Sequence, residues 1–247
     1  MFLSSDELNR AYGVDPRIAR TYVDRPVPAG NAYWKGRLLY MPPVPGFLFM
    51  PVFSDLCLRC GISAEALLSE ECLSLAERIL DSAARLEEGM IDWSGHIREC
   101  LQMAEGNASG MEAWHLLRTH LEQGGDRSPV PLRTDFPSLK RADGYLLSLC
   151  PLSPDEGTFM QAASAWRSLM CQLLVQDDLS DIREDIERGQ ENAFIEAGLT
   201  PEGADRVMSL VDGGLDILGS LNPVLAERLV ERRKRLDTHS ILGPYFN

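Results

Sequence analysis

Apolar residues recur at helical spacing over most of the chain from Ser63 onward. The segment from Ser63 to about Gly89 places them three or four positions apart, at Leu67, Leu68, Leu75, Ile79, Leu80 and Leu86. A similar segment covers 111–123 and ends at Gly124-Gly125. This spacing predicts helices with one buried face. Strand-like alternation of useful length is absent from the sequence, so the pattern predicts an all-α protein.

Three sites combine a helix-capping residue with a following proline. The clearest is Ser153-Pro154-Asp155-Glu156, where a Ser cap, a Pro at the first helical position and a Glu three residues after the cap predict a helix running to about Gly189. Thr200-Pro201 and Asn222-Pro223 repeat the signal and predict two more helices. A short helix is expected over 138–150.

The first fifty residues have a different pattern, rich in Pro, Gly, Tyr and Arg. They predict an N-terminal arm (1–62) that is poor in helix, with one short helix near Ser5 to Tyr12, packed on a helical bundle (63–247). We expect the arm and bundle to form one domain.

The charge of the chain limits its partners. Its formal net charge is -13 and its pI is near 4.8. No basic surplus is available to displace counterions from nucleic acid, and anionic lipid is disfavoured for the same reason. An acidic protein that binds an anionic substrate needs a local positive device, such as metal ions.

Location is predicted from three further features. The N-terminus lacks a basic start followed by an apolar run, so no signal peptide is expected. The longest apolar stretch, 41–53, is interrupted by prolines and is too short to span a bilayer, so no stable membrane insertion is expected. The six cysteines are scattered, which favours reduced thiols and a cytoplasmic protein. Cys57 and Cys60 form a lone CxxC that we interpret as two packed thiols.

The candidate chemistry lies in the acidic segment of the long predicted helix. Asp177, Asp181 and Asp185 are four residues apart, so their side chains lie along one helix face. Like charges at this spacing repel one another and would destabilise a bare helix. Mg²⁺ would offset the repulsion, because it takes oxygen ligands from carboxylates, phosphates and water. The alternative is a solvated charged face, which Arg183, Glu184, Glu187 and Arg188 would also fit.

Two observations favour the metal hypothesis. The aspartates directly follow the apolar run 173–175, which places them at the mouth of a buried region. Aspartate is also a poor helix former, so four of them in nine residues indicate a use for the carboxylates.

At these positions the chain resembles the class I isoprenoid synthases, which include trans-prenyltransferases, squalene and phytoene synthases and terpene cyclases. The run 177–185 is similar to the cyclase metal motif, with Asp in place of the usual Asn, Ser or Thr, and Glu; Asp177-Asp178-x-x-Asp181 also resembles the prenyltransferase motif. The run 181–190 is similar to the squalene and phytoene synthase motif, in which Arg is more usual than Gln190.

The resemblance implies a bundle around a central apolar cavity and an isoprenyl diphosphate substrate held through Mg²⁺. It implies metal ligands at Asp177, Asp178, Asp181 and Asp185, and diphosphate contacts from Arg183 and Arg188. Trp166, Phe159 and Met170 would line the cavity, where aromatic faces stabilise a carbocation; as members of a buried stripe they also fit a plain core.

One departure from the family leaves alternatives open. The first aspartate-rich motif is absent, and its best positional candidate is Asp81, with Arg85 where the last Asp would stand. Asp81 either bridges metals or is a surface residue of its helix. The first hypothesis is therefore an Mg²⁺-dependent enzyme, with cyclisation preferred over chain condensation. The second is a non-catalytic relative that binds a diphosphate or a partner subunit, and the third an unrelated helical protein. A homodimer stays open.

Overall fold

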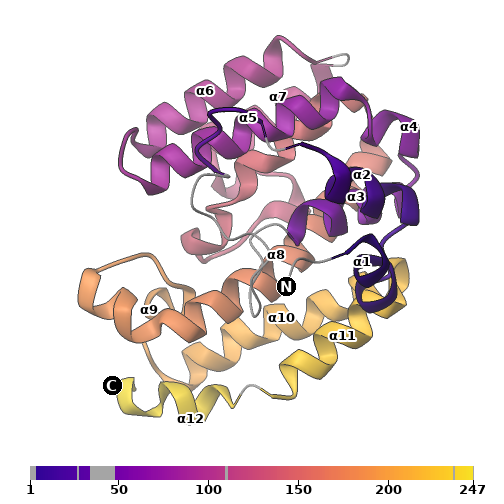
Figure 1. Ribbon diagram of the computed structural model, residues 1–247. Coiled ribbons are helices and arrows are strands. Elements are labelled where there is room, and N and C mark those ends of the chain that lie inside the picture. The colour runs from indigo at the N-terminus through magenta and orange to yellow at the C-terminus, as the bar shows by residue number, and fades with distance from the viewer. Residues whose placement is uncertain (1–3, 27, 34–47, 109–110, 236, 247) are drawn as a thin grey trace. The chain divides into compact units, whose positions relative to one another are not determined.

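The computed structural model describes residues 4–26, 28–33, 48–108, 111–235 and 237–246. Over these residues every regular element is an α-helix or a 3-10 helix and none is a strand, which confirms the predicted all-α class (Figure 1). None of the described helices combines the length and the apolar character that a membrane crossing requires. Residues 41–47 of the apolar stretch, including its first three prolines, lie outside the described residues.

The chain forms two compact units, and both are discontinuous in sequence. Unit 1 contains residues 1–133 and 143–163, and unit 2 contains 134–142 and 164–247. This division differs from the expected arm (1–62) and bundle (63–247). Each unit is described by itself below.

Unit 1 packs three helices around a buried 3-10 segment. Helices α5 (Glu70–Glu87), α6 (Trp93–Glu105) and α7 (Met111–Gln123) each contact η4 (Asp143–Leu152), and they lie side by side in Figure 1. Its further elements are α1 (Ser5–Tyr12), α2 (Pro16–Asp24), α3 (Phe49–Arg59), α4 (Ala64–Leu67), η1 (Gly125–Arg127) and η2 (Val130–Leu132). The core includes Phe53, Leu75, Ile79 and Leu117.

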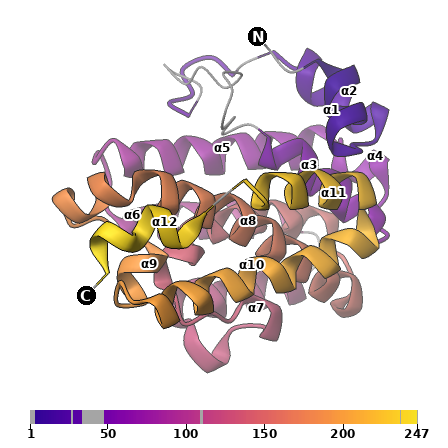
Figure 2. The same ribbon diagram turned by 90° about the horizontal axis from the view of Figure 1, so that it is seen from below.

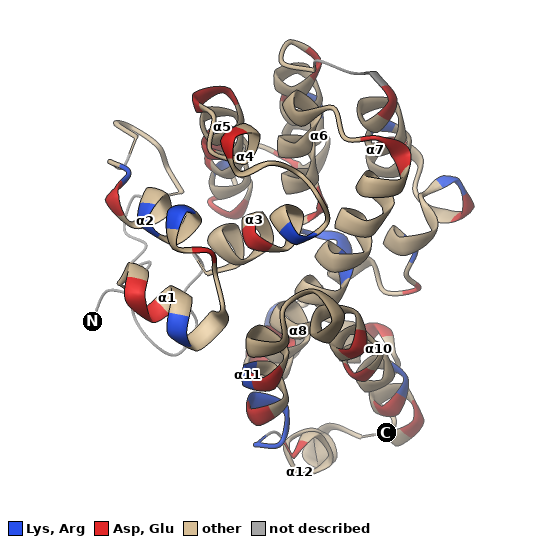
Figure 3. Ribbon diagram, turned by 90° about the vertical axis from the view of Figure 1, so that its right-hand side faces the viewer, with Lys and Arg blue, Asp and Glu red and all other residues tan. Residues whose placement is uncertain are grey.

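Unit 2 is built on the long helix α8 (Glu156–Arg188), which starts in unit 1 and continues in unit 2. Helices α10 (Pro201–Leu221) and α11 (Pro223–Arg233) lie side by side (Figure 2), and charges of both signs occur on them (Figure 3). The unit also contains η3 (Pro137–Lys140), α9 (Ala193–Glu196), α12 (Thr238–Leu242) and η5 (Gly243–Tyr245). Its core includes Val175, Leu179, Phe194 and Val207.

The N-terminal segment contains more helix than the sequence pattern predicted. The helix near Ser5 to Tyr12 is confirmed as α1. Two further helices were missed. The Asp15 side chain caps α2 with Pro16 at its first position, and Pro51 lies in the first turn of α3, where a missing N–H leaves no hydrogen bond unmade. Because α3 is buried from Met50 to Cys57, this segment is part of the core of unit 1.

Three predicted helices have different bounds or types. The helix expected from Ser63 to Gly89 is interrupted, because Ser69 leaves helical geometry and caps a new helix by accepting a hydrogen bond from the Cys72 N–H. The cap of α8 is Asp155 and not Ser153, since the Asp155 carboxylate accepts the Thr158 N–H at 2.9 Å. The helix expected over 138–150 is instead the two 3-10 segments η3 and η4.

Candidate metal and diphosphate site

The three aspartates spaced four apart all lie on α8 within unit 2, but their surroundings differ. Asp177 and Asp181 are exposed, whereas the Asp185 side chain is buried. Asp181 makes no hydrogen bond or ion pair with any described residue. Partial burial, followed by repulsion from Asp177, Asp185 and Glu184, raises the pKa of the Asp181 carboxyl above its ordinary value. This face of α8 therefore carries several negative charges close together, and the Asp181 carboxylate has no hydrogen-bond or ion-pair partner among the described residues.

Asp178 points inward and has a structural role. One of its oxygens accepts the Ala193 N–H at 2.8 Å, and the other pairs with Arg141 at 2.8 Å. Burial raises the pKa of Asp178, and the Arg141 guanidinium opposes that shift. Both oxygens are already committed, so we leave Asp178 out of the ligand set that the sequence suggested.

Asp185 is half committed. Its Oδ2 accepts a hydrogen bond from the Asn192 side-chain amide at 2.8 Å, and the same amide donates to the Asp178 carbonyl at 2.7 Å. The Asn192 oxygen in turn caps α9 by accepting the Phe194 N–H at 2.9 Å. Asn192 thus fastens the start of α9 to α8, and it holds the Asp185 carboxylate in a fixed orientation with Oδ1 left over.

Sequence reasoning missed Arg141, which follows η3. Its guanidinium pairs with Asp177 at 3.1 Å and with Asp178 at 2.8 Å. Among the described residues of unit 2, Arg141 is therefore the cation nearest to the acidic row, by which we mean Asp177, Asp181 and Asp185. In the sequence it stands 36 positions before Asp177 beside Lys140, so nothing distinguishes it from a solvated surface cation.

The two arginines expected at the diphosphate are placed differently. Arg188 is paired with Glu184 at 2.5 Å. Arg183 is exposed and makes no ion pair with a described residue. It lies two positions from Asp181, and residues two apart in a helix do not share a face. A diphosphate contact from either arginine stays a prediction.

Asp81, the candidate for the first motif, belongs to α5 of unit 1. Its Oδ1 accepts the Ala32 N–H at 2.6 Å, and its Oδ2 accepts a hydrogen bond from Arg85 at 3.2 Å. Arg85 also pairs with Glu99. Both Asp81 oxygens are therefore used within unit 1, Oδ1 by joining residue 32 to α5 and Oδ2 by pairing with Arg85 on the same helix.

The residues expected to line a cavity are buried. Trp166, Phe159 and Met170 are at most 2% exposed. None of them lines the groove between α6 and α7 in unit 1 or the shallow hollow between α8, α10 and α11 in unit 2. The central apolar cavity that the resemblance implies is thus still a prediction.

Two other groups of chemical side chains are buried. Ser128 contacts His120 Nδ1 at 2.7 Å, and His120 Nε2 donates to Asp143 at 2.8 Å, the residue types of a hydrolytic triad. All three are at most 3% exposed, and none of them lines the α6–α7 groove of unit 1, so this serine is closed to a substrate. Cys57 and Cys60 are also buried, and burial raises the pKa of Cys60 to about 11. Such a thiol is a poor nucleophile, in agreement with a packing role for this CxxC.

Among the described residues, no three of the types His, Cys, Asp and Glu stand close enough together to hold one metal ion. The chain matches no known family model, no curated protein and no solved structure. The residues of α8 and their surroundings are therefore what indicates a function. Mg²⁺ commonly binds one or two carboxylates and completes its shell with phosphate and water. Asp177 and Asp181, one turn apart with oxygens available, fit that chemistry.

Proposed function

We propose that the chain binds Mg²⁺ and an isoprenyl diphosphate on the Asp177, Asp181 and Asp185 face of α8, and acts as a class I isoprenoid synthase. Cyclisation is preferred over chain condensation, as the 177–185 motif suggests. The observation that carries the proposal is Asp181: an exposed carboxylate with a raised pKa, no partner among the described residues, and a like charge one turn away on each side. A divalent cation relieves that crowding.

Each acidic side chain on this face of α8 has its own role. Asp177 and Asp181 bind one Mg²⁺ directly, and Asp185, whose other oxygen is held by Asn192, offers Oδ1 to a neighbouring Mg²⁺. An outer hydrogen bond of this kind orients a metal ligand and is a regular part of metal sites. When bound, Mg²⁺ would neutralise charge on the diphosphate and so make it a better leaving group from an allylic carbon. Arg188, one turn beyond Asp185, is in reach of the same anion once it leaves Glu184.

A second candidate function is a non-catalytic relative that binds a diphosphate or a partner subunit. Asp81 favours it, because both of its oxygens are used within unit 1. With Asp81 committed, the first metal motif retains no free carboxylate at that position. A protein of this kind would keep the affinity for Mg²⁺ and diphosphate and lack turnover.

The binding step is tested by thermal unfolding with Mg²⁺ and inorganic pyrophosphate. A ligand that binds only the folded state raises Tm, by an amount that corresponds to about 2.7 kcal/mol at one hundred times Kd. We expect Asp181→Asn to abolish the shift. Glu187→Gln is the matched control, since Glu187 is exposed on the same helix and has no partner among the described residues. If Asp181→Asn shows the same increase in Tm as wild type, the proposed site is ruled out.

The catalytic step is tested with farnesyl and geranylgeranyl diphosphate. We expect release of pyrophosphate and a hydrocarbon or alcohol product from at least one of them, with release lost in Asp181→Asn and retained in Glu187→Gln. Binding without release supports the non-catalytic candidate. Asp81→Asn tests whether Asp81 is a metal ligand. If its role is only structural, the variant has a lower Tm than wild type without ligand, and Mg²⁺ with pyrophosphate still raises that Tm.

A further inference from the structure

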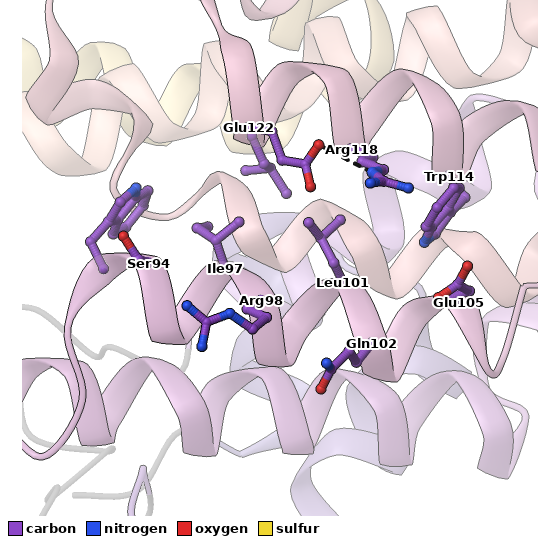
Figure 4. A pocket seen from close by; sticks show the side chains of 11 residues that line it. Ser94, Ile97, Arg98, Leu101, Gln102, Glu105, Trp114, Arg118 and Glu122 are labelled. Carbon is purple, nitrogen blue, oxygen red and sulfur yellow. Dashed lines mark hydrogen bonds and ion pairs between the residues drawn. The ribbon is translucent and has the colours of Figure 1, made fainter.

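Unit 1 contains a groove between α6 and α7 that has no part in the proposed function. Its volume is about 470 Å³. Ile97, Leu101 and Leu121 line it with apolar surface, and polar side chains stand along its edges (Figure 4). It follows α6 from Trp93 to Glu105, a length of about 18 Å at 1.5 Å per residue. The groove is thus an elongated trough.

The groove contains a buried hydrogen-bond donor without an acceptor. The Trp114 side chain is 3% exposed, and its Nε1 has no hydrogen-bond partner among the residues that the structure describes. Figure 4 shows its ring nitrogen turned toward α6. Arg118 lies over the ring at 5.2 Å and is itself paired with Glu122 at 3.1 Å, which fixes the indole in this orientation. Buried donors are nearly always paired, so this one points to an acceptor supplied by a ligand.

Two charges on the α6 edge are also uncompensated. Arg98 and Glu105 line the groove, both are exposed, and neither forms an ion pair with a described residue. They are seven residues apart, so they share one side of α6 with about 10 Å between them along its axis. The groove therefore offers donors and an acceptor distributed along its length.

This distribution selects among kinds of ligand. An apolar carboxylate needs donors alone, and Glu105 would repel it. A helix already uses its backbone groups internally, apart from its ends, and would leave the indole N–H unpaired. An extended peptide presents carbonyls and N–H groups in alternation, with apolar side chains between them. We propose that the α6–α7 groove binds an extended peptide segment of another protein, with a backbone carbonyl accepting the Trp114 N–H.

Such a peptide would engage the trough through about five residues, each rising about 3.3 Å. Its apolar side chains lie on Ile97, Leu101 and Leu121, and Trp93, 41% exposed at one end, offers a flat apolar surface. An acidic peptide side chain pairs with Arg98, and a basic one or a backbone N–H pairs with Glu105. Side-chain pockets of this kind give specificity, whereas the main-chain hydrogen bonds give affinity.

The test uses a phage-displayed library of eight-residue peptides selected on the whole chain, followed by synthesis of enriched peptides with blocked ends. We expect binding to weaken at least fivefold in Trp114→Phe, Arg98→Gln and Glu105→Gln, and to be unchanged in Arg78→Gln, an exposed arginine of α5 outside the groove. The indole N–H resonance of Trp114, assigned by its loss in Trp114→Phe, should move downfield at saturation.

Because Trp114 is buried, its variant could lose stability, and the exposed Arg98 and Glu105 variants then decide the outcome. No enriched peptide, or peptides that bind all three variants like wild type, overturns the proposal. Laurate that binds in a Trp114-dependent way and more tightly to Glu105→Gln would assign the groove to an acyl anion instead. A dimer in sedimentation that Arg98→Gln dissociates would assign it to a second copy of this chain.

Discussion

Asp178 and Asp181 are three residues apart on α8, and burial raises the pKa of both carboxyls. For Asp178, Arg141 and the Ala193 N–H compensate the buried charge. For Asp181, repulsion from three neighbouring carboxylates adds to the shift, and the Arg141 charge opposes it only as the weakest of these effects. The Asp178 carboxylate therefore has a cation and a backbone N–H as partners, whereas Asp181 has neither among the described residues, and Asp181 is the candidate ligand.

This contrast predicts the stability of Asp181→Asn without metal. Removing the charge ends repulsion with Asp177 and Asp185, each such pair costing roughly 0.2–0.5 kcal/mol in a helix. We expect the free energy of unfolding at pH 7 in EDTA to rise by up to about 1 kcal/mol, measured by urea titration. Glu187→Gln should change it less. A lower stability of Asp181→Asn would mean that the carboxylate has a structural partner.

His96 predicts a pH dependence in unit 1. Burial lowers its pKa below the ordinary value of 6.5; Glu99 opposes the shift and Arg85 adds to it. The unfolded chain therefore takes up a proton that the folded chain resists. The stabilisation is complete above about pH 6.5 and is lost as the pH falls through the folded pKa. The urea midpoint should drop between pH 7.5 and 5.5, less steeply in His96→Gln.

The control for this experiment is His115→Gln, at an exposed position on α7. We expect it to keep the wild-type slope. Equal slopes for wild type and His96→Gln would assign the pH dependence to the carboxylates.

At the scale of elements, two glycines of α10 give a matched pair. A Cβ at Gly203 would stand 2.3 Å from the Ala197 carbonyl oxygen, whereas a Cβ at Gly213 would meet nothing within 4 Å. Gly213→Ala should stabilise by about 0.5–1 kcal/mol through helix propensity. Gly203→Ala should destabilise by about 1–3 kcal/mol, since α9 and α10 must separate. Both are measured by denaturant titration, and equal effects would contradict the close approach.

Helix starts were predictable where a side chain acts on its own next turn. Thr200 and Asn222 cap α10 and α11 as expected, and Ser63 caps α4. The caps that were missed or misplaced had competitors nearby: Ser69 restarts a helix six residues after Ser63, and Asp155 takes over from Ser153. Capping depends on which of several neighbouring oxygens reaches the free N–H groups, and the local sequence does not decide that.

The spacing of the aspartates on α8 could likewise be predicted, but their hydrogen bonds and ion pairs could not. Arg141 and Asn192 reach α8 from positions 36 and 14 residues away in the sequence. Both decide which aspartate oxygens are available. The indole of Trp114 carries no sequence signal either, because a core tryptophan and one with an unpaired N–H have the same helical spacing.

At the scale of the molecule, the net charge of -13 dominates the electrostatics. Many of the surface ion pairs, such as Arg188–Glu184 and Lys234–Glu231, are exposed and contribute little. Salt should therefore stabilise the folded chain, because it screens the repulsion among the excess negative charges and costs little in lost ion pairs. We expect Tm to rise between 10 and 300 mM NaCl, concentrations at which the Debye length falls from roughly 30 to below 8 Å. A falling Tm would show that ion pairs outweigh the repulsion.

The discontinuous make-up of the two units has a consequence for biosynthesis. Unit 1 is complete once residue 163 has left the ribosome, while 164–247 are still to be made. At about 5–20 residues per second, that interval lasts several seconds, long compared with the folding of a small helical domain. During this time residues 134–142, which lie between the two sequence segments of unit 1, lack the parts of α8 and α9 that they contact in the complete chain. We therefore expect nascent chains to expose Phe136 and Leu139, which are buried in unit 2 of the folded chain, as a surface that chaperones can bind.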